Sequence, residues 1–331
     1  MDHLGDVIVT TPLIRALAMA GNTVEVIVPK AFAPVFTHSP RVKAAHAMED
    51  ICPQFPNGWR ALSDWIRAQK FDVILLPYAR QRELLWASFF SGTRTRVAMW
   101  AGVWGRLTLH QCLSSRLLDE PRYFGDVVLD CARALGIPPQ GAQPELFLSD
   151  DEIATAGKSL RQRFGTRALV GIHPGCAGNA CNLPSQVYAQ VAQSLLEQGD
   201  CALIITGGAK ERELLKTWPQ EILSSSHVWN SMGEISLRQL AVTIRHMTAY
   251  VCPSTGPLHI ASALDIPTVS PFCSIDNLSP KVWGNQRPNA TTLTPGIGFC
   301  REQRKFSAVH CDFCGKIPAA NIVEKVLGCL P

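Results

Sequence analysis

The chain has 331 residues, of which 47% are hydrophobic and 18% charged. This composition predicts a folded globular protein, and the length is too great for one ordinary core, so we expect two domains of about 150 residues each. The formal net charge is +4. This mild basicity favours an anionic substrate or a lipid surface, and it is too small to indicate a protein that binds nucleic acid. We find no run of 18 apolar residues and therefore expect no membrane span. The start, with an acid at Asp2 and a glycine at Gly5, predicts no targeting leader.

The chain contains 12 cysteines, which are scattered along the sequence. Several, such as Cys131, Cys201 and Cys252, stand in apolar contexts where a reduced thiol acts as a small hydrophobe, so we expect a cytoplasmic, reduced protein. Cys300, Cys311 and Cys314 form one cluster, with His310 as the nearest candidate for a fourth zinc ligand. Neighbouring residues rarely both reach one ion, so we predict no metal site and leave ordinary thiols or a local disulfide open.

Residues 5–20 are typical of a glycine turn entering a helix, with Pro12 tolerated in the first turn. Such a turn normally follows a buried strand, yet only four residues precede Gly5. We therefore expect that the first strand of this domain is absent from the sequence, through a late start site or a truncation. Asp6, at the start of the helix, is either a cap stabilised by the helix dipole or, if it faces a cleft, a general base.

The rest of the first half alternates between strands and helices. We expect strands over residues 23–28, 42–47, 71–77 and 96–99, and helices over 59–69 and 83–90. Residues 100–115, with two tryptophans, are predicted to be irregular: either an acceptor-facing loop or a surface excursion packed by its own aromatic residues. A helix over 123–135 then leads into a linker rich in proline and glycine, residues 137–144.

A second alternation begins at Ser149, where residues 149–152 form a capping box. The pattern predicts strands over 169–173, 202–206, 250–252 and 268–272, and helices over 185–198, 211–218, 237–246, 258–264 and 319–330. Alternation of this kind indicates an α/β protein with parallel sheets covered on both faces. We therefore expect two doubly wound halves around a hinge.

Three turns rich in small residues follow strands of the second half. They begin at His173, at Thr206 and at Ser254. In an open α/β sheet, ligands bind outside the carboxyl ends of the strands. At the third turn, unpaired N–H groups of Thr255, Gly256 and Leu258 would meet the positive end of a helix dipole, which predicts a phosphate site.

Several motifs together resemble glycosyltransferase family 9, the heptosyltransferases that build the inner core of lipopolysaccharide from ADP-heptose. They are Asp2-His-Leu-Gly-Asp6 with the helix that follows, His173-Pro-Gly175, Thr206-Gly-Gly208 before Glu211, Gly233 to Leu240, and Ser254-Thr-Gly-Pro-Leu-His259. The resemblance covers nearly the whole chain. It implies a GT-B fold, in which two Rossmann-like domains face a central cleft, and a metal-independent, inverting transfer.

The resemblance also implies the roles of individual residues. Asp6 would match the base that takes the proton from the acceptor hydroxyl. Thr255, Gly256 and Leu258 would cradle the donor pyrophosphate, and Thr10 and Thr11 would face the donor from the opposite domain. The remaining donor-side residues would be His173, Gly175, Thr206, Gly207, Glu211, Met232, Ser254 and Pro257. No cofactor is implied.

Two positions depart from the family pattern. The loop Asn179-Ala-Cys-Asn-Leu-Pro184 lacks the lysine that usually contacts phosphate and sugar, and Ser254 stands where many members have an aspartate that contacts heptose hydroxyls. Both changes bear on the identity of the donor sugar.

We therefore expect a cytoplasmic glycosyltransferase in peripheral contact with the inner membrane face. It would move a sugar from a nucleotide sugar, ADP-heptose by resemblance, to a lipid-linked lipopolysaccharide core acceptor, with no nucleic-acid partner. The expected domains are an acceptor-side domain over residues 1–140, a nucleotide-sugar domain over 141–318 and a C-terminal helix over 319–331. The alternatives are a non-catalytic nucleotide-sugar or glycan-binding relative, and a nucleotide-sugar epimerase of similar fold.

Overall fold

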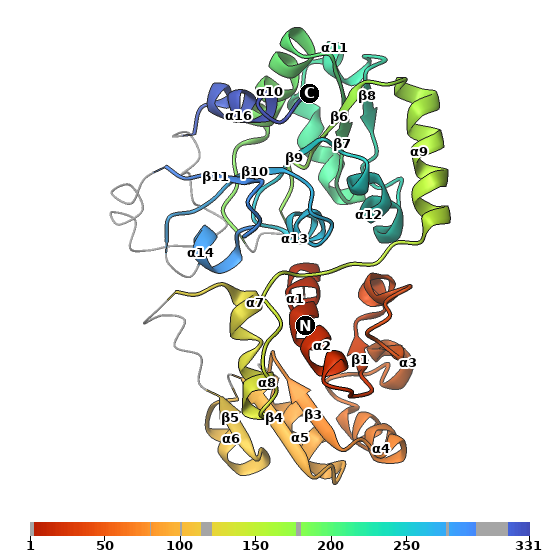
Figure 1. Ribbon diagram of the computed structural model, residues 1–331, viewed down its shortest axis with the longest axis vertical. Coiled ribbons are helices and arrows are strands. Elements are labelled where there is room, and N and C mark those ends of the chain that lie inside the picture. Colours follow the sequence, from red (N-terminus) through yellow and green to blue (C-terminus); the bar gives the residue numbers. More distant parts are fainter. Residues whose placement is uncertain are drawn as a thin grey trace. The chain divides into compact units, whose positions relative to one another are not determined.

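The computed structural model describes residues 3–79, 81–99, 101–113, 121–176, 180–275, 278–295 and 317–331. The chain divides into two compact units, Met1–Pro144 and Glu145–Pro331. Both units combine parallel β-sheets with helices (Figure 1). The predicted α/β class with Rossmann-like parallel sheets is confirmed.

The first unit contains helices and strands in alternation. Its elements are α1 (Leu4–Val9), α2 (Thr11–Met19), β1 (Glu25–Val28), the 3₁₀ helix η1 (Lys30–Phe36), β2 (Ala44–Ala47), α3 (Met48–Ile51), α4 (Trp59–Gln69), β3 (Val73–Leu76), α5 (Arg82–Phe90), β4 (Thr95–Met99), α6 (Gly102–Thr108), β5 (Gln111–Leu113), α7 (Phe124–Val127) and α8 (Asp130–Ala134).

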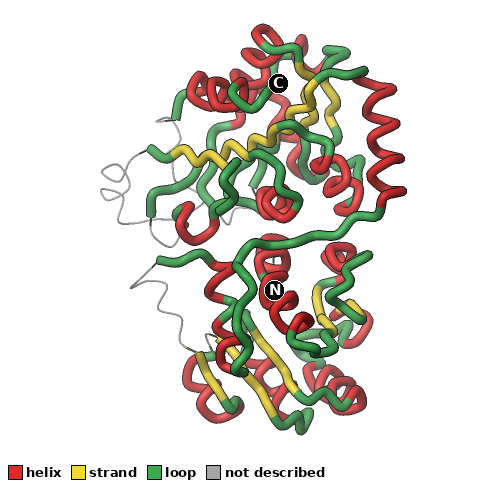
Figure 2. Tube along the Cα trace, viewed as in Figure 1, coloured by secondary structure: helices red, strands yellow, loops and turns green. Residues whose placement is uncertain are grey.

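The strands of the first unit form two separate parallel sheets, β1–β2 and β3–β4–β5. In the described part of this unit, which starts at His3, no strand precedes α1. Helix and sheet layers of the unit can be followed in Figure 2. The strands are parallel, as the alternation predicted, and in the described part of this unit they form two sheets.

The helix predicted over residues 5–20 is in fact two helices that meet at Thr10. The physical reason is Pro12, which has no N–H to donate to the carbonyl of Ile8 one turn earlier. The hydroxyl of Thr11 donates to that carbonyl instead, over 2.7 Å. The chain can therefore break its helical ladder here without leaving a buried acceptor unpaired.

Two further predictions for the first unit were wrong in detail. Residues 100–115 contain an ordered helix, α6, and the strand β5. Trp104 of α6 packs edge-on against Trp86 of α5, with ring centroids 6.0 Å apart. The predicted helix over 123–135 is likewise two short helices, α7 and α8.

The second unit opens with the predicted capping box. Ser149 accepts from the N–H of Glu152, and the Glu152 carboxylate accepts from the N–H of Ser149. The elements that follow are α9 (Asp150–Phe164), β6 (Ala168–Ile172), α10 (Ser185–Gln198), β7 (Cys201–Ile205), the 3₁₀ helix η2 (Ala209–Thr217), α11 (Gln220–Leu223), β8 (Val228–Asn230), α12 (Leu237–Arg245), β9 (Ala249–Val251), α13 (Gly256–Ala263), β10 (Thr268–Pro271), α14 (Pro280–Trp283), β11 (Ala290–Leu293) and α16 (Ala319–Leu327).

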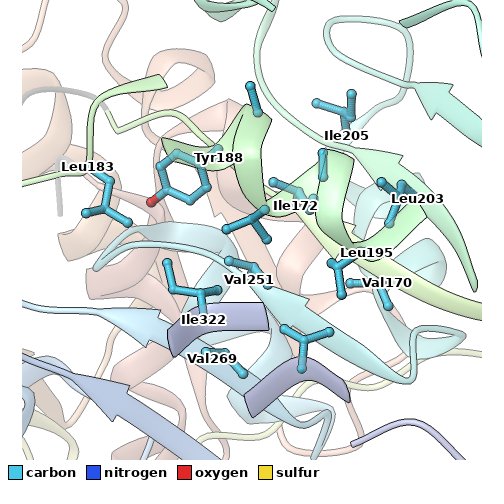
Figure 3. Packing of buried hydrophobic residues seen from close by; sticks show 14 of the residues in the cluster. Val170, Ile172, Leu183, Tyr188, Leu195, Leu203, Ile205, Val251, Val269 and Ile322 are labelled. Carbon is cyan, nitrogen blue, oxygen red and sulfur yellow. The ribbon is translucent and has the colours of Figure 1, made fainter. Parts of the chain in front are cut away.

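Six parallel strands of this unit form one sheet in the order β11-β10-β9-β6-β7-β8. The first strand, β6, lies in the middle, between β9 and β7. Valine, leucine and isoleucine side chains from the strands pack against Tyr188 and Leu195 of α10 and Ile322 of α16 (Figure 3). This core fixes the carboxyl ends of β6, β7 and β9 beside one another.

In the ranges that the structure describes, no helix is long and apolar enough to cross a membrane.

Candidate active site

The side chains that follow three neighbouring strands join in a buried hydrogen-bonded chain. His173 follows β6, Thr206 follows β7, and Tyr250 lies in β9. The Thr206 hydroxyl lies 3.0 Å from Nδ1 of His173 and 2.7 Å from the Tyr250 hydroxyl. The order of the strands, β9-β6-β7, therefore brings together residues that are 33 and 44 positions apart in the sequence.

Burial sets the protonation of this chain. It lowers the pKa of His173, against the opposing influence of Glu211 and Thr206, and it raises the pKa of Tyr250. Both groups are therefore neutral near pH 7. If Tyr250 donates to Thr206 and Thr206 donates to Nδ1, both hydroxyl protons and the lone pair of Nδ1 are used, and the imidazole proton is on Nε2. That atom faces Glu211, whose Oε2 is 4.0 Å away.

Glu211 is held where the turns after β6 and β7 approach each other. Its carboxylate accepts from the N–H of Gly208 over 2.7 Å. A Cβ atom added to Gly175 would lie 2.0 Å from Oε1, and one added to Gly207 would lie 3.1 Å from Oε2. The absence of side chains at these two glycines therefore leaves room for the carboxylate close to the backbone.

The turn after β8 lies at the same carboxyl end of the sheet as the turns after β6 and β7. Met232 is fully buried, and its carbonyl accepts from Nε of Arg212 over 2.6 Å. Gly233 adopts a left-handed φ of +67° and donates to the carbonyl of Gly207 over 2.8 Å. These bonds fix Met232 beside Gly207, since an added Cβ on Gly207 would lie 3.0 Å from the methionine methyl group.

The amino end of α13 was predicted to offer three N–H groups. Leu258 donates its N–H to the carbonyl of Thr255 over 3.0 Å, so this donor is used within the first turn. In the part of the chain that the structure describes, the N–H groups of Thr255 and Gly256 have no partner. Ser254 and these two residues are partly exposed, whereas Pro257 and Leu258 are buried. The predicted cradle thus retains two backbone donors.

His259, one residue further along α13, is buried, and burial lowers its pKa to about 4. Its ring lies edge-on to Trp283, with centroids 6.3 Å apart. These surroundings give His259 a packing role.

Three of the predicted site residues belong to the first unit. Asp6 lies in the first turn of α1 and is partly exposed. Thr10 and Thr11 are buried and donate their hydroxyl protons to the carbonyls of Asp6 and Ile8, each over 2.7 Å. A phosphate oxygen would need a free N–H or O–H group, whereas these two hydroxyl protons already bond to backbone carbonyls. These bonds favour a structural role for the two threonines, and their contact with the nucleotide sugar stays a prediction.

The loop without the expected lysine is partly described, from Ala180 onward. The Asn182 side chain donates to the carbonyl of Pro174 over 2.8 Å and accepts from the Tyr188 hydroxyl over 2.8 Å. Asn182 therefore fixes the loop to the turn after β6 and supplies no cation to this edge.

Cys300, Cys311 and Cys314 lie outside the described residues. Among the residues that are described, no group of three or more His, Cys, Asp or Glu side chains could hold a metal ion.

Sequence reasoning missed the roles of Tyr250, Arg212 and Gly233 at this edge. A tyrosine inside a strand reads as an apolar core residue, and only the pairing of β9 with β6 reveals what its hydroxyl contacts. The signal for Gly233 was available, since a glycine that follows a strand and precedes a helix is typical of a left-handed turn.

Parallel sheets with small-residue turns and a helix start at their carboxyl ends are typical of doubly wound proteins that bind nucleotides. The family profile described as glycosyltransferase family 9 (heptosyltransferase) matches residues 125–305. The chain belongs to this family, and it is a glycosyltransferase.

Individual relatives agree with this assignment. A lipopolysaccharide heptosyltransferase 2 from Salmonella typhimurium is 25% identical over 290 residues, which cover 81% of this chain and 79% of the relative. A solved structure of a family 9 glycosyl transferase from Veillonella parvula superimposes with a TM-score of 0.78 at 16% identity, over 99% of this chain and 94% of the other. The structure of ADP-heptose lipopolysaccharide heptosyltransferase II from E. coli gives 0.77 at 20% identity, over 99% and 96%. These two likenesses establish the shared GT-B fold.

Proposed function

We propose that this glycosyltransferase moves a heptose from ADP-heptose to a lipopolysaccharide core acceptor, with inversion at the anomeric carbon and without a metal ion. The observation that carries the proposal is the carboxyl edge of the second unit. There Glu211 is held between the turns after β6 and β7, and the start of α13 offers unpaired backbone donors. The names of the Salmonella and E. coli relatives supply the donor and the acceptor.

The second unit would bind the donor. The N–H groups of Thr255 and Gly256 and the dipole of α13 would hold the diphosphate, and would stabilise the negative charge that develops as it leaves. Glu211, an acceptor, would take hydrogen bonds from hydroxyl groups at the nucleoside end. Met232 would pack there, and the neutral His173 would donate through Nε2. Gly175, Thr206, Gly207, Ser254, Pro257 and Leu258 would shape the same edge.

The first unit would bind the acceptor and supply the base. Asp6 lies in the first turn of α1, and would take the proton from the acceptor hydroxyl as that oxygen attacks the anomeric carbon. The backbone around it is fixed by the hydroxyls of Thr10 and Thr11. Because such an acceptor is anionic and lipid-linked, the protein would work in peripheral contact with the cytoplasmic face of the inner membrane.

A second candidate differs in the donor sugar. Asn179–Pro184 contains no lysine, and Ser254 replaces a carboxylate that the family resemblance places near heptose hydroxyls. These two departures favour a nucleotide sugar with a different pattern of hydroxyl groups, bound at the same edge.

The test is ADP release from ADP-heptose by the purified chain with a heptose-deficient lipopolysaccharide acceptor. We expect release that requires the acceptor and that falls at least a thousandfold in Asp6→Ala, because a general base together with its positioning contributes on this order. Asp150→Asn, which alters an exposed acid in the first turn of α9, is the matched control and should retain activity.

Each result decides between the candidates. Activity that survives Asp6→Ala would remove the proposed base. Binding of ADP without turnover of ADP-heptose would support the second candidate, which a panel of other nucleotide sugars would then identify.

A further inference from the structure

The large apolar side chains that the first unit exposes gather on two neighbouring helices. Five of them lie on α5 and α6, with exposed fractions between 41% and 69%: Phe89, Phe90, Val103, Trp104 and Leu107. Figure 1 shows α5 and α6 next to the strands β3, β4 and β5. We call these five residues, with Trp59 and Trp86 beneath them, the aromatic patch.

The rings of the aromatic patch form a continuous series. Trp104 contacts Trp86, with centroids 6.0 Å apart, and Trp86 contacts Trp59 at 5.8 Å. Trp59 in turn lies 5.5 Å from Phe90, which lies 5.3 Å from Phe89. The patch is therefore one packed surface that joins α4, α5 and α6, and differs from apolar residues scattered singly over a protein.

Arginine side chains lie over the rings. The guanidinium carbon of Arg60 is 4.9 Å from the Trp59 ring centroid, and that of Arg82 is 5.4 Å from the Trp86 centroid. Arg96 lies 5.3 Å from the Phe89 centroid. Such stacking keeps the cations at the surface of the patch while their stems cover apolar area.

The charge of the chain is concentrated in the same segment. Residues 59–113 contain eight Lys and Arg against three Asp and Glu, a formal charge of +5 in a chain whose total is +4. Residues 84–118 contain four arginines and no acidic residue. Two of the three acids in the segment are paired, Glu83 with Arg82 and Asp64 with Arg67. The segment that carries the patch therefore has a positive net charge.

An open depression of about 630 Å³ adjoins the patch at the turns before β3 and β4. Arg67, Lys70 and Arg94 line it together with one acid, Asp72. Arg67 also donates to the carbonyl of Phe90, which connects the depression to the patch. Its size and charge suit an anionic headgroup.

We propose that the aromatic patch docks on an anionic lipid surface. Trp, Phe and Leu side chains that project from helices, surrounded by arginines, have the composition of helices that lie in a membrane interface. A protein partner would need complementary acidic groups against each of these cations, whereas a bilayer of anionic lipids supplies negative charge over the whole face. The inference rests on the proposed function, because it locates the membrane contact that a lipid-linked acceptor requires.

Within the first unit, α5 and α6 lie apart from α1, the helix that carries Asp6 (Figure 1). Substitutions in α5 and α6 leave Asp6 and the helix pair α1–α2 untouched.

The test is flotation of the full chain with vesicles of phosphatidylglycerol and phosphatidylethanolamine, compared with vesicles of phosphatidylcholine alone. We expect binding to the anionic vesicles, at least tenfold weaker binding by the double variant Trp104→Ser/Leu107→Ser, and a similar loss in Arg60→Gln/Arg82→Gln. Met19→Ser removes an exposed apolar side chain outside the patch, and Arg161→Gln removes an exposed cation of α9. Both controls should bind as the unchanged protein does.

Three results would overturn the proposal: no binding to the anionic vesicles, equal binding by the patch variants and the controls, or a dimer that the Trp104→Ser/Leu107→Ser variant converts to monomer without any vesicle binding. The last result would make the patch an interface between copies of this chain. Flotation requires neither the nucleotide sugar nor the acceptor. Failure to bind vesicles would therefore refute the membrane proposal alone, and failure to transfer sugar to a delipidated acceptor would refute the proposed function alone.

Discussion

Gly175→Ala is predicted to weaken nucleotide binding with little loss of stability. The new Cβ would lie 2.0 Å from Oε1 of Glu211, whereas ordinary contacts of such atoms begin near 3.4 Å. The carboxylate must therefore retreat by more than 1 Å. This movement breaks its 2.7 Å hydrogen bond from the N–H of Gly208.

The magnitude follows from the exposure of Glu211. Its side chain is 24% exposed, so water can replace part of the lost bond, and we expect the free energy of unfolding to fall by about 1 kcal/mol. A charge-assisted contact from Glu211 to a nucleoside hydroxyl would be lost in full, which corresponds to a Kd for ADP raised about 10- to 100-fold.

Calorimetric titration with ADP and urea unfolding measure the two effects separately. Gly208→Ala is the matched control, because its Cβ would lie an ordinary 3.7 Å from Oε2. Unchanged ADP affinity in Gly175→Ala would refute the placement of Glu211 in the donor site. If Gly175→Ala loses much stability but its folded form binds ADP with unchanged affinity, Gly175 has a structural role only.

Three further predictions concern the stability of each unit. The hydrogen bond from Arg238 lowers the pKa of Glu152 to about 2, from 4.5. This stabilisation is present above pH 4.5 and is lost as the pH falls toward 2. In urea unfolding, the stability at pH 6 should therefore exceed that at pH 3 by about 1 to 2 kcal/mol less in Glu152→Gln than in the unchanged protein. An unchanged difference between the two pH values would contradict the ion pair. Thr206→Val leaves two buried hydrogen-bond partners unsatisfied, and the urea midpoint should report a loss of about 2 to 4 kcal/mol that the exposed control Thr217→Val does not show. Thr11→Val should cost about 1 kcal/mol in the same assay, because the Ile8 carbonyl loses the hydroxyl donor and keeps only a backbone N–H, and Thr11→Ser should restore the stability; equal stability of the two variants would refute this role.

Local chemistry allowed much of the fold to be predicted from the sequence. The helices Trp59–Gln69 and Ser185–Gln198 have the bounds that periodicity predicted, and Ser149 starts α9 through the expected capping box. In each case the signal lies within a few residues of the element, so no tertiary contact is needed to interpret it.

Predictions failed where neighbouring elements decide the local structure. A helix is expected over residues 211–218, and the structure has a 3₁₀ helix over Ala209–Thr217. It follows a turn in which Gly208 and Glu211 bond to each other at both ends, with the N–H of Gly208 on the carboxylate and the N–H of Glu211 on the Gly208 carbonyl. That i to i+3 spacing is the 3₁₀ pattern.

At the candidate site, too, local features could be predicted from the sequence, and contacts between strands could not. The positions after β6 and β7 could be predicted, because ligands bind at the carboxyl ends of parallel strands and small residues mark those turns. The chain from Tyr250 through Thr206 to His173 could not, because it depends on which strands are neighbours, and the sequence order β6, β7, β9 differs from the order in the sheet. A hydroxyl buried in the middle of a sheet is costly unless it is paired, so the tyrosine in β9 and the threonine after β7 require each other. The carboxyl ends of β6, β7 and β9 are thus supported by contacts that no single motif contains, and substitutions in β9 should affect His173 although they lie outside every glycine-rich turn.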